Sequence, residues 1–284
     1  MSLLTAHLVC VALVGADLVA RALRIQWYLQ GLGYRVRFRD AFTLNAFGDA
    51  GCTLSPMRVA GEPLRLAGML RAGVPATAAF VAIAIEVIAA WPVIILTAAV
   101  IAWRYVPAWW VHAWPALRHT AATAWPWLAG VAVATVVAGW LAARAVRAAG
   151  HRVRRPLKRI AVYWRRMPAW PIAASVPCTL VNVLARTALL PVLAMTLPSP
   201  PPLGAMMVGS FGLLYSQLIL PTPAGLGAVD LGVLAGAAGD LGSGRTALLL
   251  AWRFYSVGAG ALLGGWLAAR IYGWRLLREV LGRV

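Results

Sequence analysis

The apolar region 203–240 is interrupted by the stretch Leu220-Pro221-Thr222-Pro223-Ala224-Gly225-Leu226-Gly227-Ala228-Val229-Asp230. This stretch decides how the chain folds. The pieces on either side have roughly 12–18 residues, too short for a helix to cross a bilayer, which needs about 20. Broken backbone is tolerated at membrane depth only where protein or water covers it. We therefore predict two half-helices that enter and leave by one face. The turn of this re-entrant hairpin contains Pro221, Thr222, Pro223, Gly225 and Gly227.

A second apolar region, 41–72, is broken in the same way, which predicts another re-entrant hairpin. Proline suits the first turn of a helix, because the N–H that it lacks would have no partner there. In both regions an acidic residue, Glu62 or Asp230, stands at the expected start of the second half-helix. The interruptions of this first hairpin are Gly48, Gly51, Pro56, Gly61 and Pro63.

Five further stretches are apolar and long enough to span a bilayer. Three of them lie between the hairpins, so the hairpins are expected to enter from opposite faces, as in transporters built from inverted repeats. The predicted fold is an all-α polytopic membrane protein, a single transmembrane domain over 1–284 with repeat cores at 41–103 and 203–271. The spans are expected at 3–23, 76–103, 121–148, 170–197 and 245–271.

The composition supports a membrane protein and excludes the main soluble alternatives. Of the 284 residues, 62% are apolar and only 12% are charged, about half the charged share of a typical soluble domain. The net charge of +18 would indicate nucleic-acid binding in a soluble chain, but no folded basic domain accompanies it. We therefore exclude disordered proteins and nucleic-acid partners, and interpret the charge as a signal of orientation.

The basic residues are unevenly placed, and their positions predict the orientation. No basic residue precedes the first apolar stretch, so we expect a retained helix with the N-terminus outside. Of the 26 basic residues, three lie in outer connections and two within spans, which leaves 21 for the inner side. The basic loop 149–168 and the C-terminus are therefore predicted to be cytoplasmic, and the basic loop 144–168 is expected to contact anionic lipid headgroups. Asp17 is expected to pair with Arg21 at the inner interface.

Six ionisable residues are expected inside the membrane, where each would cost about 2.5–3.5 kcal/mol without a partner. Their charges balance, which favours pairing around one polar cavity. Glu62 and Arg65 lie three residues apart on one helical face, and Asp230 and Arg253 are candidates for a second pair. Such pairs could serve only to hold the hairpins, but an intramembrane charge is a functional candidate by default. The six residues are Glu62, Arg65, Glu86, Arg186, Asp230 and Arg253.

The expected starts of the half-helices suit an anionic ligand. Their free N–H groups would point towards the middle of the membrane, with Arg65 or Arg253 beside them. A lipid phosphate fits this chemistry, and the nearby acids could either gate the site or carry a proton. No metal or other cofactor is expected, because the histidines and cysteines show no ligand spacing. The nucleophile and nucleotide-binding motifs of soluble enzymes are also missing from the sequence.

Two motifs in this order resemble the flippase-like transmembrane domain of lysylphosphatidylglycerol synthases, a family that includes stand-alone, hopanoid-associated and glycosyltransferase-associated members. The first motif is Gly61-Glu62-x-x-Arg65, followed by Arg71 and Glu86, and the second is 220–230, followed by Arg253. The resemblance covers about residues 20–275 and implies a lipid translocase whose re-entrant hairpins meet in a central cavity. The chain departs from the usual pattern at Val87, Ala224 and Asp230, where members usually have Arg, Gly and Glu.

The resemblance and the interior charges favour a translocase that moves a polar-headed lipid, phosphate-bearing or glycosylated, across the bacterial inner membrane without ATP hydrolysis. The alternative is a non-transporting partner that binds a lipid for a biosynthetic enzyme or acts as a scaffold for one. An intramembrane enzyme is the third interpretation. Lysyl transfer is not expected, because no aminoacyl-transferase domain follows in the sequence. The family resemblance also makes a homodimer an open alternative.

Overall fold

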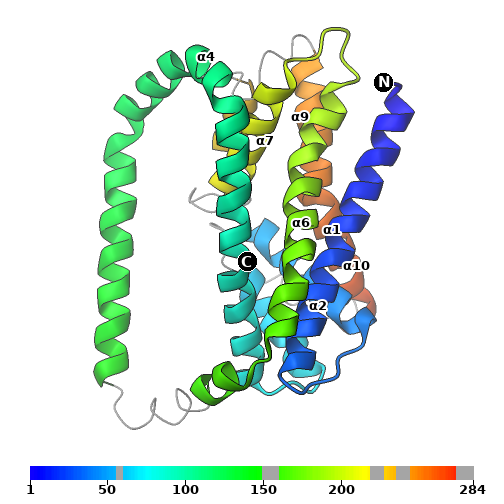
Figure 1. The fold of residues 1–284 in the computed structure, drawn as a ribbon, viewed down its shortest axis with the longest axis vertical. Helices are drawn as coiled ribbons and strands as arrows, with labels where there is room; N and C mark the ends of the chain where they lie inside the picture. The colour runs from blue at the N-terminus through cyan, green and yellow to red at the C-terminus, as the bar shows by residue number, and fades with distance from the viewer. Residues whose placement is uncertain (56–59, 149–159, 218–226, 235–243, 273–284) are drawn as a thin grey trace.

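The computed structural model describes residues 1–55, 60–148, 160–217, 227–234 and 244–272, which form an all-helical membrane bundle (Figure 1). Pro56, Pro221, Thr222, Pro223, Gly225 and segment 149–159 of the basic loop lie outside the described residues. Among the described residues, four helices are long and apolar enough to cross a membrane: Leu3–Gly31, Ala76–Val106, Ala169–Ala194 and Arg245–Ile271. The elements are α1 (Leu3–Gly31), α2 (Phe38–Leu54), α3 (Gly61–Arg71), α4 (Ala76–Ala148), α6 (Ala169–Ala194), α7 (Leu203–Ser216), α8 (Ala228–Leu234), α9 (Arg245–Arg253), the π-helix η2 (Phe254–Gly258) and α10 (Ala259–Tyr272).

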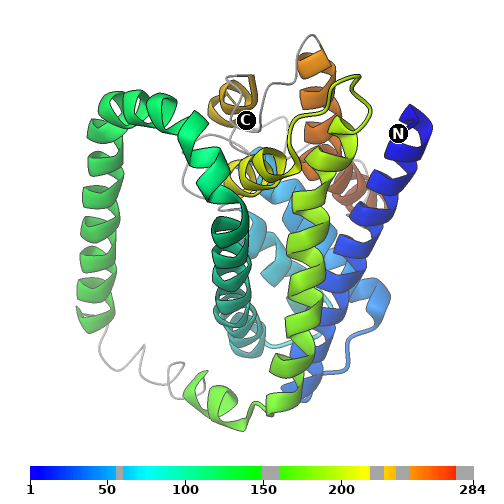
Figure 2. The ribbon, with the colours of Figure 1, turned by 45° about the horizontal axis from the view of Figure 1, so that its top comes forward.

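The path of the chain places the two helical hairpins at opposite ends of the bundle. In Figure 1, α1 runs down to the lower end, where α2 and α3 turn back on each other before α4 rises. α6 climbs to the upper end, where α7 begins and from which α9 later descends (Figures 1 and 2). α2 packs against α3, and α7 packs against α8. This path is compatible with re-entrant hairpins that enter from opposite faces.

α4 joins two of the expected spans in one continuous helix. It bends over the upper end of the bundle and runs back down, so that its second arm stands apart from the other helices (Figures 1 and 2). The first arm contains the expected span 76–103 and the second contains 121–148. Val133 and Trp140 on the second arm are exposed, as expected of apolar side chains that face lipid.

Two glycines turn the chain at the lower end. Gly33 after α1 and Gly73 after α3 have φ angles of 90° and 82°, which residues with a side chain rarely adopt. The N–H of Tyr34 then donates to the carbonyl of Leu29 at 2.9 Å, and Val74 makes the matching bond after Gly73. These are the bonds of a Schellman motif, which satisfies carbonyls at the end of a helix.

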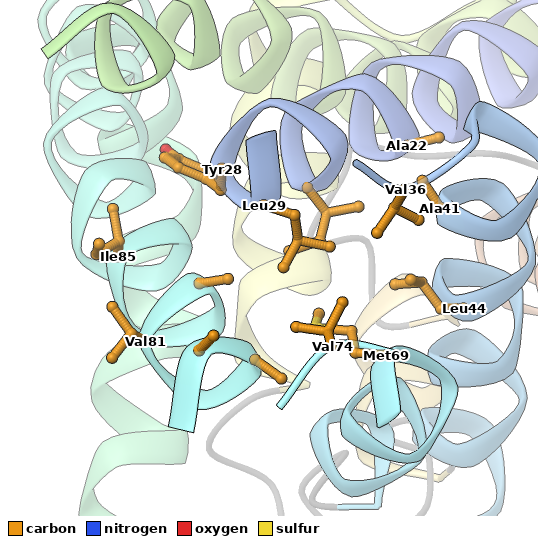
Figure 3. Packing of buried hydrophobic residues seen from close by; sticks show 14 residues of the cluster. Ala22, Tyr28, Leu29, Val36, Ala41, Leu44, Met69, Val74, Val81 and Ile85 are labelled. Carbon is orange, nitrogen blue, oxygen red and sulfur yellow. The ribbon is translucent and has the colours of Figure 1, made fainter. Parts of the chain in front are cut away.

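Two apolar cores hold the bundle, one towards each end. The lower core joins the first hairpin to α1 and α4, and contains Tyr28, Leu44 and Met69 (Figure 3). The upper core surrounds Trp252 and joins α9 to α1, α6 and the second hairpin. In a membrane such cores hold helices together by close packing rather than by exclusion of water. Each hairpin therefore belongs to a different core, α1 contributes to both, and polar residues lie between the two cores.

Glycines allow other helices to approach α2 closely. Gly264 on α10 faces the carbonyl of Ala46 on α2, and a Cβ at Gly264 would overlap that oxygen. A Cβ at Gly48 on α2 would lie 2.6 Å from Cγ of Arg65 on α3. Small residues are a usual means of close packing between membrane helices. The contact at Gly48 also determines where the stem of Arg65 lies.

Pro191 inside α6 leaves one backbone carbonyl without its helical donor. Proline has no N–H, so the carbonyl of Thr187, four residues earlier, loses its usual partner. Ser210 on α7 supplies a donor, because its buried hydroxyl donates to this carbonyl at 2.7 Å. The bond satisfies a polar group at membrane depth and connects α6 to the second hairpin.

Replacing Ser210 by Ala is expected to lower the free energy of unfolding by about 1 kcal/mol, because the Thr187 carbonyl then loses its donor. Thermal unfolding in detergent micelles measures the loss. Pro191→Ala is the matched background, since it restores the backbone N–H, and Ser210→Ala should cost much less there. An equal cost in both backgrounds would show that the hydroxyl does not serve this carbonyl.

Candidate functional site

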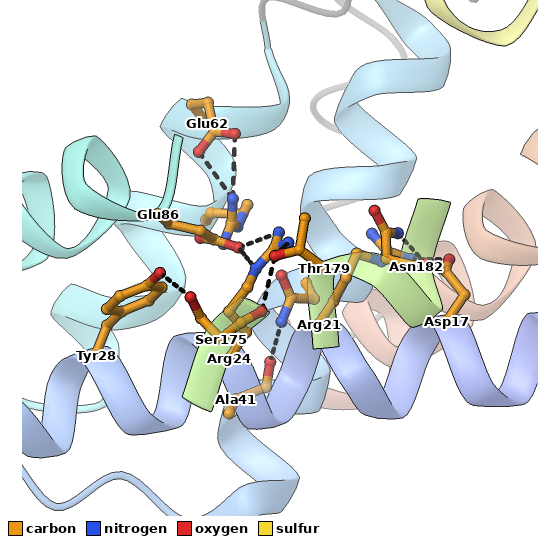
Figure 4. Close-up of polar contacts among 12 residues, drawn as sticks. Asp17, Arg21, Arg24, Tyr28, Ala41, Glu62, Glu86, Ser175, Thr179 and Asn182 are labelled. Atoms are coloured by element: carbon orange, nitrogen blue, oxygen red, sulfur yellow. Dashed lines mark hydrogen bonds and ion pairs between the residues drawn. The ribbon is translucent and has the colours of Figure 1, made fainter. Parts of the chain in front are cut away.

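α1 and α6 face each other in the middle of the bundle through matching polar stripes. The residues of each stripe are spaced by three or four positions, which places them on one face of the helix. Because the helices are antiparallel, the end of one stripe meets the start of the other, and Tyr28 donates to Ser175 Oγ at 2.6 Å (Figure 4). The stripes are Asp17, Arg21, Arg24 and Tyr28 on α1, and Ser175, Thr179, Asn182 and Arg186 on α6.

Glu86 on α4 lies between two arginines from different helices. Arg24 donates to Glu86 Oε1 from Nε at 2.9 Å and from Nη2 at 2.6 Å, and Arg65 Nη2 donates to Oε2. Arg65 also binds Glu62, with Nη1 at 3.1 Å from both carboxylate oxygens. Arg24 reaches Thr179 Oγ1 on α6 at 3.1 Å. We define Arg24, Glu62, Arg65 and Glu86 as the Glu86 cluster, which connects α1, α3, α4 and α6 (Figure 4).

A second cluster lies further along α1 towards the N-terminus. Arg21 forms two hydrogen bonds of 2.7 Å with Asp49 on α2, and its Nη2 lies 3.0 Å from Asp17 Oδ2. Arg186 Nε donates to the same Asp17 oxygen at 3.1 Å, and Asn182 donates to the other oxygen. We define Asp17, Arg21, Asp49 and Arg186 as the Asp17 cluster, which connects α1, α2 and α6.

Both clusters are largely buried, and each contains two arginines and two carboxylates. Glu86 and Asp17 are 2% and 4% exposed. One unpaired charge in a membrane costs about 2.5–3.5 kcal/mol, so the balance of charge is what permits this arrangement. The side chain of Glu62 differs from the others, because it is 49% exposed. It is the most accessible of the eight charged groups.

Asp230 and Arg253 form an ion pair at the second hairpin. Arg253 Nε lies 2.5 Å from Asp230 Oδ1, and its guanidinium carbon lies 5.5 Å from the ring centroid of Trp252. Asp230 Oδ2 accepts the N–H of Gly227 at 2.8 Å, which caps the first turn of α8. The π-helix Phe254–Gly258 follows Arg253 directly, and such turns are frequent at functional sites.

Two small cavities lie among the described residues, and the first adjoins these charges. One of about 10 Å³ is lined by the Asp17 cluster and by Ser256 of η2, and has room for about one water molecule. Two buried donors, Ser256 Oγ and Arg21 Nε, have no hydrogen-bond partner among the described residues. The other, of about 170 Å³, is lined by Asp40 and Arg71 among others. Neither has the volume of a phospholipid, so a lipid could enter either only if the bundle opened.

The six residues singled out from the sequence fall into three places. Glu62, Arg65 and Glu86 meet in the Glu86 cluster. Asp230 and Arg253 form the expected pair at a second place. Arg186 belongs to the Asp17 cluster, which contains none of the other five. The interior charges are therefore distributed over three places rather than gathered around one cavity.

Three basic residues that the sequence analysis counted on the inner face are buried instead. α1 extends to Gly31, well beyond the expected end at 23, so Arg21 and Arg24 lie inside the bundle. Arg65 is buried between two carboxylates. Asp17 does pair with Arg21, but the pair lies in the middle of α1 and is buried. The prediction of an interfacial pair is therefore wrong.

Sequence reasoning missed Arg24 and Asp49 as parts of the site. A signal for Arg24 was available, because it continues the helical spacing of Asp17 and Arg21, and α6 carries a matching stripe. Asp49 is an acid within the apolar first hairpin, and its position there was the only hint of burial. Charged residues at helical spacing inside apolar segments are therefore expected to pair with opposite charges on other helices rather than to lie in a loop.

Comparison with known families identifies the chain. The family described as the lysylphosphatidylglycerol synthase TM region matches residues 2–264. Comparisons with curated proteins and with solved structures give no match. The matched part contains both clusters and the Asp230–Arg253 pair. Because the match covers most of the 284 residues, the chain belongs to the family of the lysylphosphatidylglycerol synthase transmembrane region.

Proposed function

We propose that the protein moves a polar-headed, phosphate-bearing or glycosylated lipid across a bacterial inner membrane without ATP hydrolysis. One observation carries the proposal: at each hairpin an arginine is held by an acid from the first turn of a half-helix. These pairs are Glu62–Arg65 and Asp230–Arg253. Membership of the family and the four apolar helices support a role in a lipid membrane.

The geometry of these pairs suits the exchange of one anion for another. Arginine binds carboxylates and phosphates with the same planar set of donors. The side chains of Glu62 and Asp230 are 49% and 24% exposed, whereas those of Arg65 and Arg253 are 11% and 13% exposed. The acids therefore cover the arginines, and a headgroup would reach an arginine by taking the place of its acid. Arg65 Nε, which has no partner among the described residues, is a spare donor.

The remaining charged residues would hold in place the side chains that take part in the exchange. Glu86 binds Arg24 and Arg65 together, so it would hold Arg65 while Glu62 is replaced. Arg186 would act through the Asp17 cluster, by connecting α6 to α1 and α2. The hairpins at opposite ends would expose the site alternately to the two sides. The sequence contains no P-loop motif, so movement would be passive or driven by a gradient.

Orientation and partners belong to the same proposal. We propose an outward N-terminus, and a C-terminus and 149–168 loop that face the cytoplasm and contact anionic lipids. A homodimer and a lipid-biosynthetic enzyme are the proposed protein partners.

Replacing Arg253 by Gln is expected to slow lipid movement by about 10–100-fold, the equivalent of one charged hydrogen bond worth about 1.5–3 kcal/mol. Flux is measured in liposomes with acyl-labelled fluorescent lipids of different headgroups. Arg270→Gln is the matched control, because Arg270 is exposed at the end of α10 and lies over Trp266. Equal rates for wild type and Arg253→Gln with every lipid would contradict the proposed mechanism.

The same preparation tests the alternative role as a non-transporting partner. Native mass spectrometry of the purified protein reports whether a lipid stays bound. A tightly held lipid together with no flux in liposomes would favour a lipid-presenting partner of a biosynthetic enzyme. A new product from the added lipid would instead indicate an intramembrane enzyme.

A further inference from the structure

The Glu86 cluster has no net positive charge to offer an anion. Arg24 and Arg65 are balanced by Glu62 and Glu86. A phosphodiester that took the place of Glu62 on Arg65 would leave the site and the displaced carboxylate with one excess negative charge. An uncompensated charge at membrane depth costs about 2.5–3.5 kcal/mol. The exchange therefore becomes favourable when one negative charge is removed at the same time.

Glu62 is the group that can lose its charge. Both of its hydrogen bonds go to one nitrogen, Arg65 Nη1. Once a phosphate occupies that nitrogen, Glu62 has no other cationic partner among the described residues, and an unpaired carboxylate in a medium of low polarity binds a proton. Its side chain is 49% exposed, the largest exposure in the Glu86 cluster. Glu86 does not fit this role, because it is 2% exposed and keeps Arg24 as a partner.

The surrounding ionisable groups do not alter this balance. α4 contributes Glu86, and α1 contributes Arg24, which acts through Glu86. On α2, Cys52 contributes a thiol whose Sγ faces Gly61. Among the described residues, Glu62 is therefore the proton-binding group of this exchange.

We propose that Glu62 binds one proton for each anionic headgroup that binds Arg65, so that lipid movement is coupled to proton movement; this inference rests on the proposed function. The proton adds to a carboxylate oxygen of Glu62 as its two bonds to Arg65 Nη1 break, and Nη1 then donates to the phosphate. The loaded site contains two arginines, one carboxylate and one phosphate, and is neutral. Release on the other side reverses both steps. A zwitterionic lipid brings no net charge and takes no proton.

The test is transport driven by a pH gradient across vesicles of phosphatidylcholine that contain the full chain and a trace of acyl-labelled phosphatidylglycerol. Labelled lipid in the outer leaflet is destroyed by an impermeant reductant, so the protected fraction reports the inner leaflet. With an alkaline interior, the anionic lipid should accumulate inside, up to about tenfold for each pH unit at one proton per lipid. Protein-free vesicles and labelled phosphatidylcholine should show no such accumulation over the same time.

The Glu62→Gln variant tests whether Glu62 is the residue that couples lipid movement to proton movement. Because this variant cannot bind the proton, we expect the labelled phosphatidylglycerol that it moves, at whatever rate, to reach the same inner fraction with and without the pH gradient. Asp40→Asn is the matched control, since Asp40 is an exposed acid at the start of α2 outside both clusters. This control should accumulate lipid like the wild type. Unchanged size-exclusion profiles in detergent confirm that the variants are folded.

The outcomes distinguish this inference from the proposed function. If the wild type moves phosphatidylglycerol at a rate and to an extent that do not depend on the pH gradient, proton coupling is overturned. The proposal that the protein translocates lipid is then unaffected. Accumulation that persists in Glu62→Gln overturns the assignment of the proton to Glu62. The absence of flux for every lipid in the wild type removes the proposed function itself. Accumulation in the wild type and in Asp40→Asn, together with measurable flux in Glu62→Gln that does not respond to the pH gradient, supports the inference. Loss of all flux in Glu62→Gln would instead show that Glu62 is needed for movement itself and would overturn its assignment as a separate proton carrier.

Discussion

Replacing Glu86 by Gln is expected to lower the free energy of unfolding by about 3–5 kcal/mol, the cost of leaving a buried charge without its partner. Glutamine has almost the shape of glutamate, so the effect reports charge rather than packing. Both arginines would lose their ion pair with Glu86. The cluster would keep one carboxylate, Glu62, which pairs with Arg65. Thermal unfolding in detergent, followed by circular dichroism, measures the change.

A second substitution identifies the cause of this loss. Arg24→Gln alone should also destabilise the protein, because it removes one of the two cations that balance Glu86. Arg24→Gln combined with Glu86→Gln restores neutrality, since Arg65 and Glu62 still balance each other, and it should recover most of the stability. Asp40→Asn at the exposed start of α2 should have no effect. A double variant as unstable as Glu86→Gln would show that charge balance is not the cause.

Replacing Gly264 by Ala is expected to destabilise the bundle by about 1–3 kcal/mol or more, the usual cost of overpacking. The added Cβ would overlap the Ala46 carbonyl oxygen and lie 3.0 Å from Ala50 Cβ, both on α2. A backbone carbonyl cannot rotate away as the end of a long side chain can, so α10 must move off α2. Unfolding in detergent measures this loss.

The neighbouring glycine provides a matched control. Nothing lies within 4 Å of a Cβ placed on Gly265, so Gly265→Ala adds a methyl group without a clash. Alanine also favours the helix by up to about 1 kcal/mol over glycine, and this gain is common to both variants. Gly265→Ala should therefore leave stability unchanged or raise it. Equal losses for both variants would show that the close contact between α2 and α10 is not responsible.

Features that depend on local physics could be predicted from the sequence. Prolines and glycines shorten apolar segments, and this alone predicts two hairpins and places Glu62 and Asp230 in the first turns of α3 and α8. The Glu62–Arg65 pair spans one helical turn and follows from spacing. The Asp230–Arg253 pair was predicted from balanced charges in the second repeat, and the structure has it.

Features that depend on contacts between helices could not be predicted in this way. A scale of hydrophobicity counts Arg21 and Arg24 as the end of a span, because it takes no account of partners on other helices. Both arginines are paired with carboxylates on α2 or α4, so α1 continues to Gly31. Which acid meets which arginine depends on the rotation of each helix about its axis, which one sequence does not reveal.

The register of the polar stripes on α1 and α6 has a mechanical consequence. Tyr28 meets Ser175, and Arg24 meets Thr179. A slide of α1 by one turn, about 5.4 Å, would place Arg24 level with Val183 or with Ser175, and every pair would change at once. A smaller step would break these bonds without bringing new partners level with one another. The bonds between the two stripes therefore hold α1 and α6 in one register.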